Sequence, residues 1–175
     1  NGDPKIDGPD LARKIAYDLG GQSYILNAPL VVENAETAQA LLSQKAIRET
    51  MQLAANADFA LIGIGSVRLE RTSLIRSGHT TTAEMVRIME QGAVGDVLAR
   101  HYDANGRLLN LDLSRRTIGI DIDTLVNSDT TVIGIAGGRM KADAILGALR
   151  GQYIDVLITD TSAAEAVLKL GNGRY

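Results

Sequence analysis

The chain has 175 residues, which fits one domain and would just accommodate two small ones. Its net charge of −3 argues against a domain that holds a nucleic-acid backbone by itself, because such binding needs a concentrated basic face. Cysteine is absent, which excludes disulfide frameworks, thiolate metal sites and cysteine nucleophiles. The sequence shows no apolar run long enough for a spanning helix and no signal peptide, so we expect a cytoplasmic location.

Amphipathic stretches alternate with short apolar runs, a pattern typical of βαβ units and a mainly parallel sheet. Residues 1–4 are expected to lie inside a loop. A helix is predicted over residues 9–19, which begin with proline and are followed by two glycines. Residues 23–26 predict a buried strand, and two short helices are expected around residues 36–43 and 46–56.

The middle of the chain predicts a central strand and a hairpin. Residues 58–66 are almost unbroken in their apolarity, which favours a strand covered on both faces. The segment Thr81–Glu84 has the capping-box pattern that begins a helix. Apolar runs at residues 98–102 and 108–113 flank the turn signal Asp103–Gly106, so we expect an antiparallel hairpin beside the parallel strands.

The last third has the most regular pattern. Residues 131–136 and 154–159 predict strands, and each is followed by a helix, the second of them over residues 162–170. The first of these helices is expected to bury Met140, Ala144, Ile145, Ala148 and Leu149. The whole order of elements predicts an α/β fold of three Rossmann-like layers, with a mainly parallel sheet, helices on both faces and one antiparallel hairpin.

Two glycines, Gly137 and Gly138, join a predicted strand to the start of a helix. Free backbone N–H groups at a helix start attract anions, and Lys141 on the first turn adds a positive charge, so this loop is a candidate anion site. The alternative is a tight turn with a solvated lysine. Gly63 and Gly65 end the earlier strand in the same way, and ligands gather at the carboxyl ends of parallel strands, so a shared cleft is predicted. Alternatively, these glycines allow a neighbour to pack closely.

Arg76 and Asp96 are the charged candidates outside the glycine loops. Arg76 lies among small polar residues and could fork two donors to a phosphate or carboxylate, although an exposed loop arginine is the alternative. Asp96 interrupts an apolar stretch and could accept sugar hydroxyls, cap the next segment or satisfy backbone donors. His79 and His101 have no metal-ligand spacing and are expected at the surface. Asp160 is expected to cap the last helix. No metal, cofactor or catalytic residue is predicted.

Taken in order, several segments resemble the SorC-type sugar-binding domains, which are the effector domains of bacterial regulators of sugar and central-carbon operons. The resemblance covers the chain from about Pro9 to Leu170. It rests on Leu61–Gly65, Ser73–Gly78, Ala93–Asp96 with Asp103 and Gly106, Ile135–Gly138, Lys141-Ala142, Ala144-Ile145, Leu149–Gly151 and Val156–Asp160 with Ala163 and Ala164.

The resemblance implies a Rossmann-like fold related to sugar-phosphate isomerases of the ribose-phosphate and glucosamine-phosphate type. It implies that Lys141 binds the ligand at the glycine loop, that Arg76 binds a phosphate and that Asp96 binds hydroxyls. It also implies a homodimer or homotetramer whose binding to operator DNA is controlled by the effector. The family's domain normally has an earlier βα unit with a phosphate-binding Gly-Thr loop, and a helix-turn-helix module before it. Neither is found in residues 1–175, which we expect to form an effector domain without them.

Three functions remain open. The expected one is sensing of a phosphorylated sugar for a transcription regulator, without enzymatic activity. The alternative is a sugar-phosphate isomerase-like enzyme, but isomerisation needs a positioned acid and base of tuned pKa, and neither Asp96 nor Asp160 has a partner with a distinct role in the sequence. The third is a pure oligomerisation module with a degenerate pocket.

Overall fold

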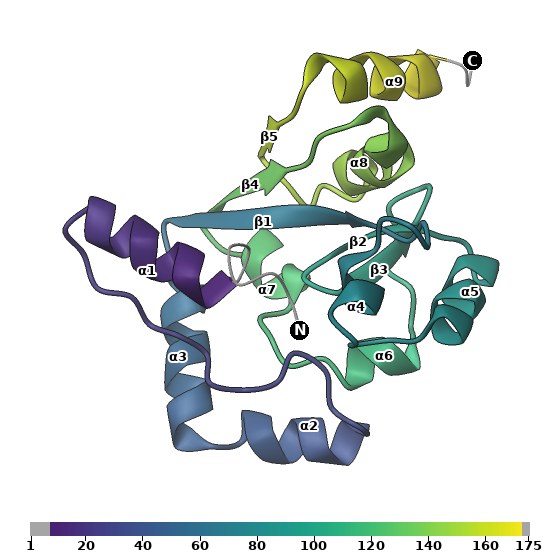
Figure 1. Ribbon diagram of the computed structural model, residues 1–175. Helices are drawn as coiled ribbons and strands as arrows, with labels where there is room; N and C mark the ends of the chain where they lie inside the picture. The colour runs from purple at the N-terminus through teal and green to yellow at the C-terminus, as the bar shows by residue number, and fades with distance from the viewer. Residues whose placement is uncertain (1–7, 173–175) are drawn as a thin grey trace.

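The computed structural model describes residues 8–172, so the loop expected at residues 1–4 lies outside the described part. Five strands form one sheet in the order β3-β2-β1-β4-β5 (Figure 1). β1 pairs in parallel with β4, and β4 in parallel with β5, whereas β2 and β3 are antiparallel additions on the other side of β1. The α/β fold with parallel strands and one antiparallel hairpin is confirmed. The strands are β1 Phe59–Ser66, β2 Ala93–Val97, β3 Arg100–Asp103, β4 Thr131–Ile135 and β5 Val156–Ile158.

The predicted helices are present, and three further short ones, α4, α6 and α7, lie where no helix was expected. Local capping explains where two of the predicted helices begin. The side chain of Asn34 accepts a hydrogen bond from the N–H of Thr37 at the start of α2, and that of Thr81 accepts one from the N–H of Glu84 at the start of α5. The helices are α1 Gly8–Asp18, α2 Ala35–Leu42, α3 Lys45–Ala55, α4 Ser73–Arg76, α5 Thr82–Glu90, α6 Asp112–Arg115, α7 Ile122–Val126, α8 Ala142–Arg150 and α9 Thr161–Asn172, with a 3-10 turn η2 Arg139–Lys141 before α8.

The main core lies between the sheet and α8, which packs on β1 and β2. Small residues let the helix approach closely, since a Cβ added to Gly95 would lie 2.5 Å from the Cβ of Ala144. The hydroxyl of Tyr102 donates to the backbone oxygen of Ala144 at 2.9 Å and ties β3 to the helix. Met140 and Leu149, which were expected in this core, are exposed. The buried residues of α8 are mostly small, because a helix so close to the sheet has little room for long side chains: they are Ala142, Ala144, Ile145, Gly147 and Ala148.

A second, smaller core lies among α4, α5, the β2–β3 hairpin and α6. Leu74, Met85, Ile88 and Leu113 are buried in it. This cluster covers residues of β2 and of the loop after β1, and so it fixes the segment that carries Arg76 next to the end of β1.

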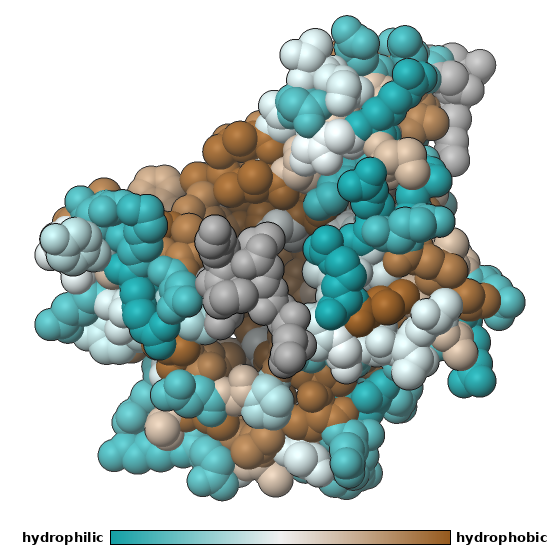
Figure 2. Space-filling view, in the orientation of Figure 1, coloured by the Kyte–Doolittle hydropathy of each residue, from teal (hydrophilic) through white to brown (hydrophobic). Residues whose placement is uncertain are grey.

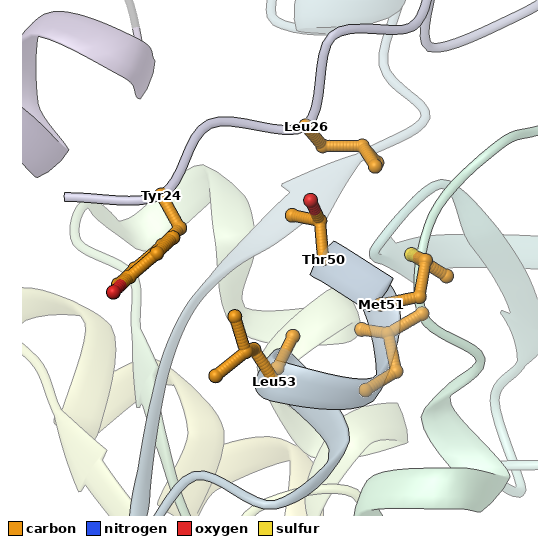
Figure 3. Close-up of a pocket in the computed structure, with 7 residues that line it drawn as sticks. Tyr24, Leu26, Thr50, Met51 and Leu53 are labelled. Atoms are coloured by element: carbon orange, nitrogen blue, oxygen red, sulfur yellow. The ribbon is translucent and has the colours of Figure 1, made fainter. Parts of the chain in front are cut away.

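The predicted strand at residues 23–26 is wrong. This segment is irregular, and in the described part of the chain its backbone pairs with no strand. Two of its side chains lie beside α3 instead: Tyr24 and Leu26 line an apolar groove with Met51 and Leu53 (Figure 3). An apolar run of four residues does not distinguish strand pairing from packing against a helix.

The hairpin is present, but its turn and second strand were placed wrongly. The turn is Leu98-Ala99, where both residues have positive φ (51° and 59°), and it joins β2 to β3. A two-residue turn of this kind matches the twist of the strands but is usually built from glycine or asparagine. The expected turn at Asp103–Gly106 does form, yet residues 108–113 contribute only an isolated bridge and the start of α6.

The expectation that β1 is covered on both faces is also wrong. Ile62 and Ile64 are buried beneath α8, but Phe59 and Leu61 on the opposite face are 67% and 56% exposed. They form an apolar surface, the open sheet face, together with Ile135, Val156 and Ile158. Figure 2 shows apolar residues gathered over β4 and β5 in this region. The described helices therefore leave one face of the parallel strands uncovered.

Candidate functional site

The site is built at the edge where the parallel strands β1 and β4 end. The register pairs Gly63 with Ile135, so Gly65 and the loop after β4 leave the sheet at the same edge. η2 follows that loop, and its last residue, Lys141, reaches back across the edge. The Nζ atom of Lys141 donates to the backbone oxygen of Ile64 at 2.6 Å. A partly buried ammonium group thus lies at the end of β1.

Asp96 comes to the same place from the antiparallel side of the sheet. It is the register partner of Gly65, and its carboxyl lies over that glycine so closely that a Cβ there would overlap Oδ1. Gly65 therefore does allow close packing of a neighbour, and the neighbour is the candidate carboxylate itself. The two readings of this glycine that the sequence left open are not exclusive.

The charges of Asp96, Lys141 and Arg76 act on one another. Desolvation raises the pKa of Asp96 to about 6, against the opposing effects of the Ala99 backbone and the positive charge of Lys141. Desolvation lowers the pKa of Lys141; Asp96 opposes this shift and Arg76 adds to it. Arg76 ends α4, is exposed, and takes part in none of the ion pairs found within residues 8–172. The fold therefore brings one hydrogen-bond acceptor, Asp96, close to two cationic donors, Lys141 and Arg76.

The loop Gly137-Gly138 has a different environment from the one expected. The Gly138 N–H donates to Oδ2 of Asp160 at 2.5 Å, and a Cβ on Gly137 would lie 2.6 Å from the same oxygen. Oδ1 of Asp160 accepts from the N–H of Ala163 and the hydroxyl of Ser162, which confirms Asp160 as a cap of α9. These hydrogen bonds lower the pKa of Asp160. The Gly138 amide is therefore not free, because the protein's own carboxylate already occupies it.

Gly63 faces open space on the same strand face as Gly65, since no atom lies within 4 Å of the position of its Cβ. This face continues the open sheet face, so the region above the two glycines is approached from the side that the described helices leave uncovered. The structure thus groups Gly63, Gly65, Asp96 and Lys141 with Arg76 nearby, whereas the two glycines after β4 turn toward Asp160.

His101 was expected at the surface, and this is wrong. It is 0% exposed, lies in β3 as the register partner of Asp96, and has no hydrogen-bond partner on either ring nitrogen in the described residues. Burial lowers its pKa to about 4, against the effect of the charge of Glu84. The sequence could not predict this burial because it did not reveal the turn at Leu98-Ala99. That turn sets the strand register in which His101 pairs with Asp96. His79 is partly exposed.

Two cavities are lined by residues other than Asp96, Lys141 and His101. The apolar groove of Figure 3 has a volume of about 350 Å³, and a smaller hollow lies between η2 and α9, lined by Arg139, Asp143 and Lys169 among others. Within residues 8–172, no three histidine, aspartate or glutamate side chains are grouped in a way that could hold a metal ion. No helix in that part of the chain is long and apolar enough to cross a membrane.

The sequence has clear relatives. Residues 3–169 match the family described as "Putative sugar-binding domain". The chain is 38% identical to the transcriptional regulator LsrR of Klebsiella pneumoniae over 94% of its own length and 51% of the regulator's, and 31% identical to the erythritol catabolism regulatory protein EryD of Brucella abortus over the same shares. It therefore spans about half the length of these curated relatives.

Solved structures agree with the sequence matches. The sugar-binding domain of a transcriptional repressor from Vibrio fischeri superposes with a TM-score of 0.86 at 32% identity, over 98% of this chain and 68% of that one. The sorbitol operon regulator SorC from Klebsiella pneumoniae superposes with a TM-score of 0.82 at 29% identity, over 91% of this chain and 51% of that one. The chain belongs to the sugar-binding domain family of SorC-type transcriptional regulators.

Proposed function

We propose that this chain senses a phosphorylated sugar for a bacterial transcriptional regulator. The observation that carries the proposal is the meeting of Asp96 and Lys141 at the end of β1, where a carboxyl lies over Gly65 and an ammonium is anchored on the neighbouring carbonyl. A carboxylate beside a cationic donor suits a ligand that has both hydroxyl groups and negative charge. The family membership supports the sugar, and the positive charges support the phosphate.

Each residue has a proposed role in this site. Asp96 accepts hydrogen bonds from sugar hydroxyls, and Lys141 donates to a hydroxyl, carbonyl or phosphate oxygen. Arg76, whose guanidinium is exposed, forks two N–H donors to the phosphate. Gly63 and Gly65 let the ligand approach the strand. Gly137 and Gly138 border the site, and an anion would take up the Gly138 amide only by displacing Asp160.

The regulator around this domain is part of the same proposal. The effector would control DNA binding through a helix-turn-helix module that is not part of residues 1–175, in a cytoplasmic homodimer or homotetramer without a cofactor. A βα unit with a phosphate-binding loop, also not part of residues 1–175, would complete the pocket on the open side of the sheet. The relatives support this picture, since those named above are transcriptional regulators.

Calorimetric titration of the full-length regulator tests the proposal. The panel should contain ribose 5-phosphate, glucose 6-phosphate, fructose 6-phosphate and the same sugars without phosphate. We expect saturable binding of at least one phosphate and weaker binding of its unphosphorylated partner. Absence of binding across the panel, by a protein that still binds operator DNA, would contradict the proposal.

An isomerase-like enzyme is the second candidate, and one observation favours it. A carboxyl with a pKa of about 6 beside a lysine has the tuning that general acid–base catalysis needs near neutral pH. A coupled assay for aldose–ketose conversion separates the two functions. Turnover that disappears in Asp96→Asn would favour the enzyme, whereas binding without turnover would favour the sensor.

A further inference from the structure

His101 is a buried polar residue that the proposed effector site does not use. His101 is 0% exposed, and neither of its ring nitrogens, Nδ1 or Nε2, has a hydrogen-bond partner within the described part of the chain. Buried polar side chains are nearly always paired, and each exception calls for an explanation. An apolar side chain would fill the same space without this cost, so the imidazole itself needs a role.

The sheet register places His101 beside the carboxyl of Asp96. Gly65 pairs with Asp96 and Asp96 pairs with His101, so the three residues form one row across β1, β2 and β3. Tyr102 binds α8 on one face of the sheet, and successive side chains alternate, so His101 lies on the opposite face, as Asp96 does. Directly opposed residues have Cβ atoms about 4.5–5.5 Å apart, which is within reach of a side-chain rotation.

The other acidic neighbour of His101 is already engaged. Glu84 of α5 accepts from the hydroxyl of Thr80 at 2.6 Å and from Nη2 of Arg116 at 2.5 Å. No described side chain donates a hydrogen bond to Asp96, since the Lys141 ammonium is bonded to a backbone oxygen. Among the described residues, the imidazole of His101 therefore has no partner, and the carboxyl of Asp96, which accepts from the Ala99 backbone, faces it across one strand pair.

We propose that His101 is a positioning residue for the effector: its imidazole pairs with the carboxyl of Asp96 and holds that carboxyl in place for the ligand. The inference rests on the proposed function for the ligand, but the pairing of the two side chains can be tested without one. Hydrogen bonds of functional groups are often long in an unliganded site and tighten on binding.

The protonation states of the two residues fit this role. Burial lowers the pKa of His101 to about 4 and raises that of Asp96 to about 6. Near pH 7 the imidazole is therefore neutral, with one N–H donor, and the carboxyl is an ionised acceptor. Among the surrounding charges, Lys141 of η2 favours the ionised carboxyl, and Glu84 of α5 favours the protonated imidazole. Below about pH 6 the carboxyl takes up a proton and loses part of its capacity to accept from a sugar hydroxyl.

Three variants of the full-length regulator test the ligand side of the proposal. His101→Phe keeps the ring volume and removes both nitrogens, His101→Gln keeps a donor, and Tyr153→Phe removes a different buried hydroxyl, the one bonded to Gly106. The probe is whichever of ribose 5-phosphate, glucose 6-phosphate and fructose 6-phosphate binds the wild type most tightly. We expect His101→Phe to weaken binding about tenfold, and His101→Gln and Tyr153→Phe to stay within about threefold of the wild type.

Nuclear magnetic resonance on the unvaried chain tests the pairing itself, whether or not the variants fold. The Asp96 carboxyl carbon and the His101 ring nitrogens are followed from pH 4 to pH 8. We expect the ring nitrogens to report a step at the midpoint of the Asp96 carboxyl, as coupled groups do. No such step, or wild-type affinity of a folded His101→Phe at every pH, would overturn the proposal. If no sugar phosphate binds the wild type, the proposed function fails while this titration still decides the pairing.

Discussion

The carboxyl of Asp96 lies against the backbone of Gly65, in the space that a Cβ would occupy. Any side chain at this position would push the carboxyl away from the end of β1, and we expect Gly65→Ala to weaken sugar-phosphate binding by about tenfold or more while the sheet persists. Gly119→Ala is the matched control, because Gly119 lies outside the proposed site and no atom lies within 4 Å of its Cβ position. Calorimetry on both variants measures the difference, and equal affinities would remove Asp96 from the site.

Lys141 is expected to contribute directly to binding. Its ammonium has one described hydrogen bond, to the Ile64 oxygen, and an ammonium has three donors, so two remain for a ligand. Lys141→Ala should weaken effector binding by about 1.5–3 kcal/mol, the range for hydrogen bonds to charged groups. Lys169→Ala, on the exposed part of α9, removes the same charge elsewhere and should leave affinity unchanged. An unaltered dissociation constant for Lys141→Ala would take this residue out of the site.

The sequence predicted the parallel part of the sheet well because its signals are local. Each parallel strand is a short, mainly apolar run in the sequence, and capping residues such as Thr81 mark a helix start. It failed at the β2–β3 hairpin, where Leu98 and Ala99 adopt positive φ without the glycine or asparagine that announces such a turn. Tertiary packing holds them there, and Ala99 is buried. The burial of His101 could not be predicted without that turn.

The candidate site shows the same division. Asp96, Lys141 and Gly65 could be proposed from strand ends and charge, because ligands gather where parallel strands end. The bond from Gly138 to Asp160 could not, because it joins two loops 22 residues apart in the chain. A glycine loop before a helix predicts an anion-binding site. The sequence does not show that the anion bound to the loop amide is the protein's own Asp160 carboxylate.

Tyr102 is expected to be a stabilising link between the hairpin and α8. Its buried hydroxyl donates to the Ala144 oxygen at 2.9 Å, and Tyr102→Phe should lower the free energy of unfolding by about 1 kcal/mol. Tyr17→Phe is the control, since that side chain is 84% exposed and its loss of a hydroxyl should have no measurable effect. Urea unfolding monitored by circular dichroism gives both values. Equal midpoints for the two variants would mean that the hydroxyl does not stabilise the packing.

Asp96 should make the protein less stable as pH rises. Its pKa is about 6 in the folded chain against 3.8 for an unperturbed aspartate, so the folded state binds its proton more tightly than the unfolded state. The cost of the buried charge is absent below pH 4 and complete above pH 6. The free energy of unfolding of the wild type should therefore fall relative to Asp96→Asn across this window, by at most about 3 kcal/mol. If the free energies of unfolding of the wild type and Asp96→Asn differ by the same amount at every pH from 4 to 7, this prediction is contradicted.

His101 should have the opposite effect over nearly the same range. Its pKa is about 4 when folded and 6.5 when unperturbed, so the unfolded state binds the proton more tightly and stability is lost as pH falls from 6.5 to 4. His101→Phe removes this loss, and the wild type should lose up to about 3 kcal/mol relative to the variant as the solution is acidified. Because the slopes from Asp96 and His101 have opposite signs, they should largely cancel in the wild type, and each should appear only when the other residue is replaced. A wild-type minus His101→Phe difference that does not change with pH would show that the buried imidazole keeps an ordinary pKa.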